Sequence, residues 1–559
     1  MSDAAPATVS SAPAERVAPD VRTRPRRATA SLNDSCGPST PLRASVGSSK
    51  GVASGAPPDG FPVVLTADRS LFSRYDVLLD GMIAAAQTTR TPSPLMKGVL
   101  ARRASSAGVR ARAAPLGLRR IEAAFAAHGR PRQETAVVAP EHLARAVGSA
   151  TRLVGLSSGD PLGLGMTSTT MASVVGGEPW TTRCFRRLAR RVGRIRRRAP
   201  AARLIMGGPG AWQLAQDEEA RRTLGIDHVI LGYCEGNLGQ LVQGILEDPS
   251  APPVLHGRCA EPEAIPPILG PTVMGSVEIS RGCGLGCDFC TLGREPMVHL
   301  PLETILSDVE TNLSAGVTDA VLITEDVFRF GARGREAEAG PLLALLARLR
   351  SLPRLRHVQT DHANILSAAQ LADKELIEIH RLLTGGDAPE TLAWLNLGVE
   401  TASGELLEAH GGRAKMGDIA REEWGQVCLH QVRRLSRLGY FPLVSLVLGL
   451  PGETQADVAA TLRWVSQLRH DRVAVFPVLH APTGPGEPAF GREDMTPLHW
   501  RLFRACYRLN FRWMPRLFWS NHVRADVPLG RRLLIQALGR GQVWWWRGIL
   551  AWRSRRPFR

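Results

Sequence analysis

The sequence predicts an α/β protein in which two successive parallel-sheet domains precede a helical C-terminal region. Short apolar runs alternate with helical patterns from about residue 59 to 265 and again from about 272 to 485, as is typical of parallel sheets. From Pro497 onward the alternation stops, and aromatic and basic residues recur at helical spacing. The expected segments are a disordered tail (1–58), a first α/β domain (59–268), a second α/β domain (269–490) and a basic, Trp-rich helical region (491–559).

Composition indicates the class of protein and the compartment in which we expect it. Its 559 residues are 44% hydrophobic, which suits a globular protein with a sizeable core. Residues 1–58 are rich in Ala, Pro, Ser and Arg and lack periodicity, so we expect disorder there. Nine cysteines favour a reducing compartment over a disulfide scaffold. Because no apolar run reaches about 18 residues and no signal-peptide core is visible, we expect a cytoplasmic protein.

The formal charge of +17 is concentrated at one end of the chain. Residues 501–559 hold fourteen Arg, no Lys and one acid, a net +13, which leaves +4 for the rest. A nucleic-acid-binding protein would spread its basic surface differently. We therefore expect no specific nucleic-acid partner.

The sequence of the first domain predicts a repeated order of strand, loop and helix. Glycine-rich loops follow three successive strands, at 159–165, 207–212 and 232–236. In a doubly wound parallel sheet such loops line one crevice at the carboxyl ends of the strands. The expected strands are 61–66, 135–139, 151–157, 203–206 and 228–231, and the expected helices are 118–128, 184–197 and 238–246.

The second domain contains six expected strands with helices between them. This number suits an open (β/α)6 partial barrel, whose functional loops follow the carboxyl ends of the strands. The strands are 277–280, 320–324, 356–361, 394–399, 442–448 and 472–478.

The C-terminal region carries an aromatic stripe and an arginine stripe on different helical faces. We expect Pro515 to end or kink the first helix, with further helical stretches at 531–538 and 542–552. The favoured interpretation is a cap whose aromatic face packs on the second domain. A docking surface for an acidic peptide or carrier-bound substrate comes second, and peripheral attachment to anionic lipid is a third alternative that we do not favour. The aromatic stripe is Trp500, Phe503, Tyr507, Phe511 and Met514, and the arginine stripe is Arg501, Arg504, Arg508 and Arg512.

Three cysteines follow the first strand of the second domain at C-x3-C-x2-C spacing. Cys283, Cys287 and Cys290 can hold three irons of a [4Fe–4S] cluster on one loop and leave the fourth iron open for chemistry. Gly282, Gly284 and Gly286 let the backbone wrap closely. The alternatives are a zinc site, which usually needs a closed set of four ligands, and a chance cluster. No second Cys or His pair stands nearby in the sequence.

With Phe289 beside Cys290, this motif resembles the C-x3-C-x-aromatic-C signature of the radical S-adenosylmethionine (SAM) enzymes. The resemblance implies that SAM chelates the open iron and is cleaved by an electron from the cluster to a 5′-deoxyadenosyl radical. It further implies that Phe289 lies near the adenine, that Glu400 and Ser403 approach SAM or its ribose, and that Gly449 and Gly452 make room near the adenine. Glu325 or Asp326 would contact SAM or substrate, and a flavodoxin- or ferredoxin-type protein would donate the electron.

The loops of the first domain resemble those of the cobalamin-binding domains that precede a subclass of radical SAM barrels. The alternative is a structural Rossmann-like domain. The chain has no Asp-x-His-x-x-Gly motif, so the resemblance implies cobalamin without its own base or a histidine as lower ligand. In the third loop Cys234 replaces an acid and leaves Glu235. For Trp212, covering a corrin face and packing in the core are equal alternatives. The residues that the resemblance implies are Asp160, Gly163, Gly165, Ser168, Thr169, Thr170, Gly207, Gly208, Trp212 and Glu235.

The resemblance as a whole implies a cobalamin-dependent radical SAM methyltransferase that methylates an unactivated carbon through a 5′-deoxyadenosyl radical and methylcobalamin. The substrate, a peptide or a small molecule, is not identified. One alternative is a cobalamin-dependent radical rearrangement, cyclisation or other non-methylating reaction. Methylthiolation would need further cysteine ligands, and Cys36, Cys184 and Cys234 lack the spacing for a second cluster. A cobalamin-binding sensor without catalysis is the remaining alternative.

Overall fold

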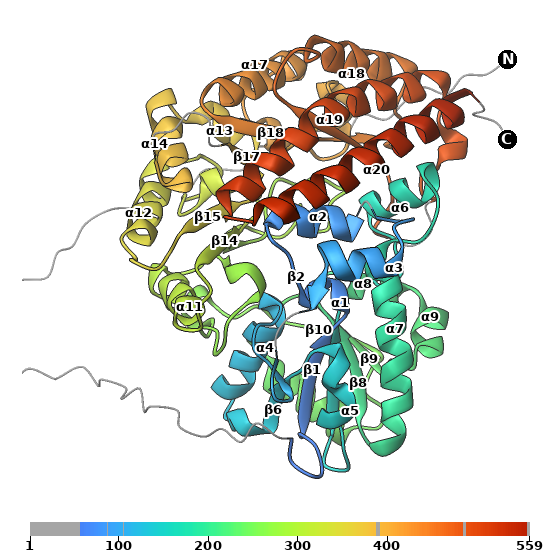
Figure 1. Ribbon diagram of the computed structural model, residues 1–559, viewed down its shortest axis with the longest axis vertical. Helices are drawn as coiled ribbons and strands as arrows, with labels where there is room; N and C mark the ends of the chain where they lie inside the picture. The colour runs from blue at the N-terminus through green and yellow to red at the C-terminus, as the bar shows by residue number, and fades with distance from the viewer. Residues whose placement is uncertain (1–55, 87, 104–105, 387–391, 485–487, 556–559) are drawn as a thin grey trace, which may run out of the picture. The chain divides into compact units, whose positions relative to one another are not determined.

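The computed structural model describes residues 56–86, 88–103, 106–386, 392–484 and 488–555, and Figure 1 shows their arrangement. The predicted disordered tail, residues 1–58, therefore lies almost wholly outside the described residues. The described residues all belong to one compact unit.

The first domain is a parallel sheet, as predicted, and it has six strands where five were expected. Its strand order is β10-β9-β8-β7-β1-β6, and every pairing is parallel. The strand order reverses beside β1, so the topological switch point lies between β1 and β7, where open α/β sheets bind ligands. Only the short edge strand β10 was not predicted. The strands are β1 (Val63–Ala67), β6 (Thr135–Val137), β7 (Leu153–Ser157), β8 (Arg203–Gly207), β9 (His228–Leu231) and β10 (Val254–His256).

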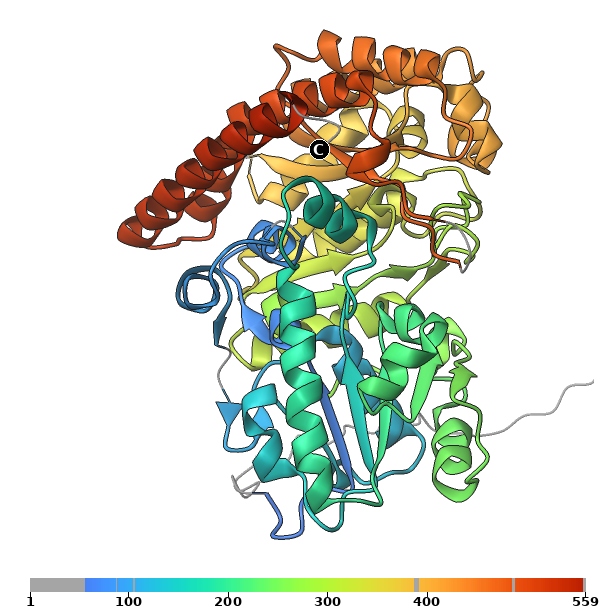
Figure 2. The same ribbon diagram turned by 90° about the vertical axis from the view of Figure 1, so that its right-hand side faces the viewer.

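Helices cover both faces of this sheet because its strand residues are apolar on both sides. Val64, Leu156 and Met206 pack under α5, α7 and α8, while Leu65 and Ile205 pack under α4 and α10. In Figure 2 the long α7 runs along the near side of this domain. The helices are α4 (Leu116–Ala127), α5 (Leu143–Ala146), α7 (Trp180–Ile195), α8 (Ala211–Gln216), α9 (Glu218–Thr223) and α10 (Leu238–Glu247).

The second domain is the expected partial barrel, and all six predicted strands form. It consists of two parallel sheets, β11-β14-β15 and β16-β17-β18-β19. The strands are β11 (Ser276–Glu278), β14 (Asp319–Ile323), β15 (His357–Thr360), β16 (His362–Ala363), β17 (Ala393–Glu400), β18 (Tyr440–Leu448) and β19 (Ala474–Leu479). The covering helices are α11 (Leu302–Ser314), α12 (Ala339–Arg350), α13 (Ile365–Gln370), α14 (Asp373–Thr384), α15 (Gly404–Ala409), α16 (Arg413–Met416), α17 (Trp424–Arg437) and α18 (Gln455–Gln467).

The inner face of the barrel is packed by two helices from opposite ends of the chain. Trp394 and Phe441 point inward and meet Leu79 of α2 (Leu78–Ala86) and Leu517 of α19 (Pro497–Arg524). The side chain of Asn510 on α19 also binds the outer edge of β19. It accepts a hydrogen bond from the Val475 N–H and donates one to the Val475 carbonyl, each at 2.7 Å.

The aromatic stripe of α19 packs on the barrel, which confirms the predicted cap for this helix. Trp500, Phe503 and Tyr507 belong to the barrel core, and Phe503 stacks on Tyr507. The prediction for Pro515 was wrong where it expected an end, since α19 continues through this residue to Arg524. The two predicted stretches beyond it form one helix, α20 (Leu529–Arg555). No helix of the described ranges is both long and apolar enough to cross a membrane.

Candidate functional site

The three cysteines lie on a tightly folded loop at the mouth of the barrel. The loop leaves β11 and β12 (Ser280–Arg281), and Gly282, Gly284 and Gly286 all have positive φ, between 68° and 81°. Only glycine adopts this conformation without strain. Cys287 is buried, Cys283 is half-buried and Cys290 is exposed. Burial raises the pKa of the Cys283 thiol to about 11.

Polar contacts from other strand ends hold this loop in place. His410 binds the Asp288 carboxylate through Nδ1 at 3.1 Å and the Pro451 carbonyl through Nε2 at 2.8 Å. The Arg329 guanidinium donates to the Cys283 carbonyl at 2.9 Å. The loop is thus connected both to the β14 side and to the β18 side of the barrel.

The spacing of the three sulfur atoms does not match a single zinc ion. Zinc bound by thiolates at about 2.3 Å brings its sulfurs within about 4 Å of one another. Among the described residues, the three loop cysteines are not a group whose ligand atoms all lie within 4.8 Å of one another. The group that meets this limit is Asp76, Asp80 and His522, but Asp76 already pairs with two arginines, so that group is an ion-pair network.

A buried ion pair lies beside the cysteines. Glu400 ends β17 with a φ of 65°, which is strained for a residue with a side chain, and its carboxylate pairs with the ammonium of Lys415. Burial lowers the pKa of Lys415, but Glu400 and the nearby thiols of Cys287 and Cys283 outweigh this, so that the pKa is raised. The mouth therefore holds a carboxylate and an ammonium, two groups that can receive the polar ends of an amino acid. Sequence reasoning missed Lys415 because it belongs to no motif.

The other residues expected near SAM occupy varied surroundings. The Phe289 side chain is buried in the barrel core. Ser403 caps α15 by accepting from the Leu406 N–H. The ring of Phe490 lies against Gly449, whereas the space beside Gly452 is open.

One of the two acidic residues after β14 is fully hydrogen-bonded within the fold. Asp326 is fully buried and accepts hydrogen bonds from Asn364 and Ser367. Glu325 is only half-buried, and burial raises the pKa of its carboxyl group. Glu325 is therefore the acid that remains for a ligand.

The loops of the first sheet meet at its carboxyl edge, as predicted. An added Cβ at Gly208 would overlap Ser157, and one at Gly210 would overlap Pro161, so these glycines permit loops to pack on each other. An added Cβ at Gly159, Gly207 or Gly232 would meet no atom closer than 3.9 Å. These three, at the ends of neighbouring strands, leave backbone open to a large planar ligand.

Two of the three hydroxyl residues predicted at this crevice face helix backbone. Thr169 donates to Gly165 and Met166 carbonyls. Thr170 donates to Met166 and accepts from the Leu479 N–H of β19 at 2.7 Å, so it joins α6 (Met166–Val174) to the barrel. Ser168 is buried on the same helix.

Asp160 and Trp212 stay at the crevice. Asp160 accepts from Gln213 at 2.6 Å and from the Gly165 N–H, and Gly163 adopts a φ of 79° in the same loop. Trp212 is half-buried and belongs to none of the apolar clusters of the described residues. Trp212 therefore does not pack in an apolar core, which was the alternative to covering a planar ligand.

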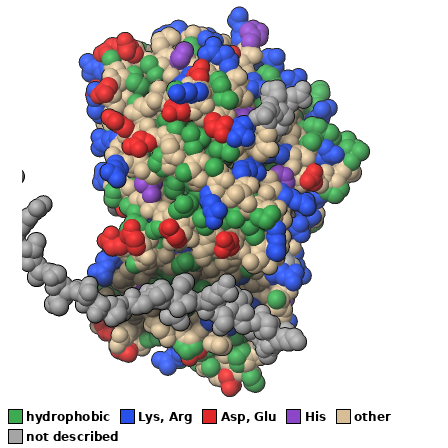
Figure 3. All heavy atoms as spheres, turned by 90° about the vertical axis from the view of Figure 1, so that its left-hand side faces the viewer, with side chains coloured by type: hydrophobic (Ala, Val, Ile, Leu, Met, Phe, Trp, Pro, Cys, Tyr) green, Lys and Arg blue, Asp and Glu red, His purple; other side chains and the backbone are tan. Residues whose placement is uncertain are grey.

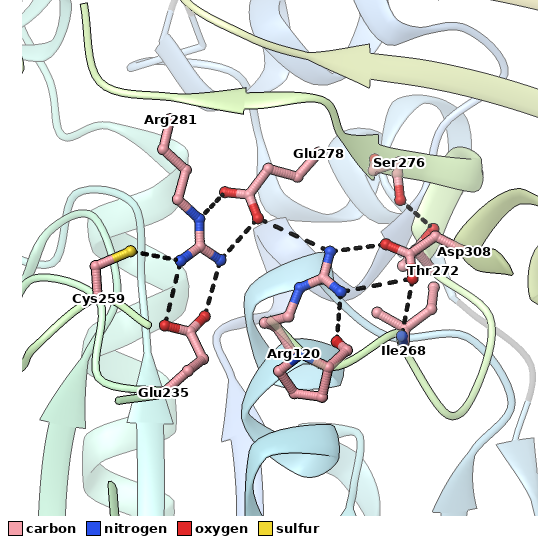
Figure 4. Close-up of polar contacts among 10 residues, drawn as sticks. Arg120, Glu235, Cys259, Ile268, Thr272, Ser276, Glu278, Arg281 and Asp308 are labelled. Atoms are coloured by element: carbon pink, nitrogen blue, oxygen red, sulfur yellow. Dashed lines mark hydrogen bonds and ion pairs between the residues drawn. The ribbon is translucent and has the colours of Figure 1, made fainter. Parts of the chain in front are cut away.

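A buried ionic network connects the third crevice loop to the strand that leads into the cysteine loop (Figure 4). Arg281 of β12 donates to Glu235 at 2.8 Å and to Glu278 at 2.9 Å, and it lies over the ring of Tyr233. Glu278 is 3.8 Å from Arg120, which pairs with Asp308 at 2.7 Å. Glu235 thus serves as a bridge between the two parts of the site.

Comparison with known proteins identifies the second domain. Residues 277–465 match the family model described as the radical SAM superfamily. The match includes the cysteine loop, Glu400, Lys415 and the glycines after β18. The chain therefore contains a radical SAM domain, and the [4Fe–4S] cluster and SAM are its cofactors.

Curated relatives match only part of this chain. The tRNA-2-methylthio-N(6)-dimethylallyladenosine synthase of Acidithiobacillus ferrooxidans is 32% identical over 230 residues, 40% of this chain and 45% of that protein. The enzyme of the same description from Halorhodospira halophila is 29% identical over 234 residues, 41% of this chain and 44% of that protein. The chain spans less than half of the length of these relatives.

A solved structure of the radical SAM methyltransferase TsrM from Kitasatospora setae, with tryptophan substrate and a SAM analogue bound, is 16% identical. It covers 76% of this chain and 75% of that chain at a TM-score of 0.48. A second structure of TsrM contains cobalamin and a [4Fe–4S] cluster and has the same TM-score. A likeness of this extent carries no argument about the ligands of this chain.

Proposed function

We propose that this chain is a cobalamin-dependent radical SAM enzyme that methylates an unactivated carbon. The observation that carries the proposal is the Glu235–Arg281 bridge. It fixes the third loop of the crevice to the residue two positions before Cys283. Two cofactor sites that must act on one substrate carbon need such a fixed arrangement, because reacting atoms have to lie about 3–3.5 Å apart.

Each part of the site has a separate task in this proposal. When bound, the cluster and SAM supply a radical that removes hydrogen, and the corrinoid supplies a methyl group. Cys283, Cys287 and Cys290 would hold the cluster, and Glu400 and Lys415 would orient the polar groups of SAM. The open backbone at Gly159, Gly207 and Gly232 would receive the corrinoid, and Trp212 would exclude water from its face.

The substrate and the electron donor belong to the same proposal. We expect a peptide or small-molecule substrate and a flavodoxin- or ferredoxin-type donor. The C-terminal helices offer a place near the barrel, since Tyr507, Phe511, Trp545 and Trp546 line an apolar cavity of about 400 Å³ that α19 and α20 form together with residues from 83–100. Trp544 and Trp552 are exposed on α20, so substrate docking and lipid contact remain proposals for its outer face.

Methylthiolation, the activity in the names of the curated relatives, is not our proposal. A second cluster would need its own cysteines close together. Among the described residues, Cys184 lies in α7, Cys428 in α17 and Cys506 in α19. Cys184 is buried in one apolar cluster, and the other two, on different helices, are buried in another.

Anaerobic reconstitution tests the proposal. The full-length protein should bind about four iron and four sulfide, convert SAM to 5′-deoxyadenosine under reduction, and retain hydroxocobalamin through gel filtration. Cys287→Ala should lose the iron and SAM cleavage but keep the corrinoid. Cys259→Ser changes an exposed thiol outside the loop but keeps an atom that can accept the hydrogen bond from Arg281, so it should behave as wild type.

The cluster assignment and the cobalamin assignment can be contradicted independently of each other. Retention of a full cluster by Cys287→Ala would contradict the cluster assignment. Loss of all corrinoid from the wild-type protein, with SAM cleavage intact, would overturn the cobalamin assignment and leave a radical SAM enzyme without it.

A further inference from the structure

A basic pocket of about 590 Å³ opens on the first domain, away from the cysteine loop and the crevice. Five segments line it: α1 (Arg69–Phe72), η1 (Met96–Leu100), β3 (Arg102–Arg103), η3 (Pro140–His142) and α7. None of its lining residues belongs to the three crevice loops.

One face of α7 supplies most of the positive charge. Residues 180–198 contain nine Arg and no acid. Arg187, Arg190, Arg191 and Arg194 line the pocket at positions i, i+3, i+4 and i+7, which share one helical face. Arg69, Lys97 and Arg103 complete the lining from segments distant in the sequence.

This positive charge is almost uncompensated. The one carboxylate in the lining, Glu141, pairs with Arg69 at 2.5 Å. Arg191 donates to the Pro140 carbonyl and Arg187 to the Ser93 hydroxyl, both neutral groups. Across the described ranges, the other six cations of the pocket form no ion pair.

Converging cations differ from an ordinary solvated surface. On the face in Figure 3, basic and acidic side chains are interspersed over the barrel, so their charges compensate one another. In the pocket, like charges from separate segments repel, and an anion that enters relieves this repulsion.

We propose that this pocket binds an organic phosphate, meaning a phosphate or diphosphate group joined to a body with an apolar face. Guanidinium groups match phosphate oxygens in bidentate geometry, and Pro140, Leu188 and Cys184 provide an apolar part of the lining for the rest of the ligand. The volume falls in the range of small-molecule sites, about 300–1,000 Å³. This site goes beyond the proposed methyl transfer and does not depend on it.

Calorimetric titration of the full-length protein with pyrophosphate and with adenosine 5′-diphosphate tests the site. We expect saturable one-site binding of both and a raised melting temperature. Arg190→Gln/Arg194→Gln should weaken binding at least tenfold. The control Arg197→Gln/Arg222→Gln removes the same charge from exposed positions outside the pocket and should bind as wild type.

Thermal melting tests the pocket in the absence of any ligand. At low salt, the pocket variant should melt at a higher temperature than wild type, because repulsion has been removed, and the control should not. Non-saturable binding, or equal weakening in both variants, would overturn the site. A short RNA that binds through Arg190 and Arg194 while neither phosphate probe binds would also overturn it, in favour of a nucleic-acid surface.

Discussion

At the scale of single residues, the end of β17 combines strain with a tight fit. Glu400 adopts a left-handed φ of 65°, which costs about 1–2 kcal/mol, and an added Cβ at Gly398 would overlap both its carboxylate and the Lys415 ammonium. Strain kept at a strand end beside the cysteine loop indicates a functional constraint. Gly398 therefore makes the space in which this ion pair forms.

Gly398→Ala should displace the Glu400–Lys415 pair. Separating a buried pair costs about 3–5 kcal/mol when one charge is left alone, and we expect about 1–3 kcal/mol here because both charges remain. Equilibrium dialysis should show weaker SAM binding to the reconstituted variant, and urea unfolding should show the lost stability. Gly340→Ala has open space around its new methyl group and should lower neither quantity. Unchanged SAM affinity in Gly398→Ala would argue that the pair has no part in binding.

Asp68, directly after β1 at the switch point, predicts a pH dependence of stability. Burial raises the pKa of its carboxyl group from 3.8 to about 6. The folded state therefore holds a proton that the unfolded state has lost, and the free energy of unfolding falls as pH rises from about 4 to about 6. The effect is at most about 3 kcal/mol.

Asp68→Asn should remove this dependence while keeping the cap of α1, in which the side chain accepts from the Ser70 N–H. The variant should match wild type near pH 4 and become more stable above pH 6. Urea unfolding at a series of pH values measures the difference, and a constant difference across this range would contradict the assignment.

At the scale of elements, α19 is attached to the barrel by its polar as well as its aromatic residues. Asn510→Leu keeps the number and branching of the side-chain heavy atoms but leaves the buried Val475 N–H and carbonyl unpaired. An unsatisfied buried group costs about 1–3 kcal/mol, so we expect a loss of about 2–4 kcal/mol in chemical unfolding. Arg508→Ala, at an exposed position two residues away on the same helix, should change stability by less than about 0.5 kcal/mol. A similarly small loss for Asn510→Leu would show that β19 needs no partner there.

The elements that the sequence predicts are those whose hydrophobic pattern is clear. Six of the seven barrel strands were predicted because each is a buried apolar run between turn residues, and the one missed is the two-residue β16. Helix α2 was missed because Leu78–Ala86 lies between the barrel strands and α19, so that it is apolar on several sides and lacks a stripe. Pro515 was misjudged because its neighbours Met514 and Leu517 are buried, and such burial offsets the roughly 3 kcal/mol that an interior proline costs.

At the scale of the whole molecule, Arg281 connects the two parts of the proposed site. Arg281→Met would leave the buried carboxylates of Glu235 and Glu278 without this partner, which costs about 3–5 kcal/mol. Glu235→Gln should cost less, because Arg281 keeps Glu278. Thermal unfolding should rank the two variants in this order, and Arg437→Met, at an exposed position, should not change the melting temperature. The reverse order would contradict the bridge.

The same network shows where prediction from sequence stops. Cys283, Cys287 and Cys290 carry their signal in local spacing, whereas Glu235 and Arg281 lie 46 positions apart and meet only because two sheets place their strand ends together. Lys415 and Glu400 likewise meet through the barrel. Contacts of this kind depend on topology, and a single sequence does not encode them in a readable motif.

The hydrogen bonds between Asn510 and β19 have a consequence for work with shortened forms of the protein. A partial barrel ends in strands that no neighbour closes, and an uncovered strand edge is a template for pairing with another chain. Here the helix that covers one edge is close to the C-terminus. Shortened chains that end before α19 should therefore precipitate through strand addition, and their insolubility would report an exposed edge and not a loss of cofactors.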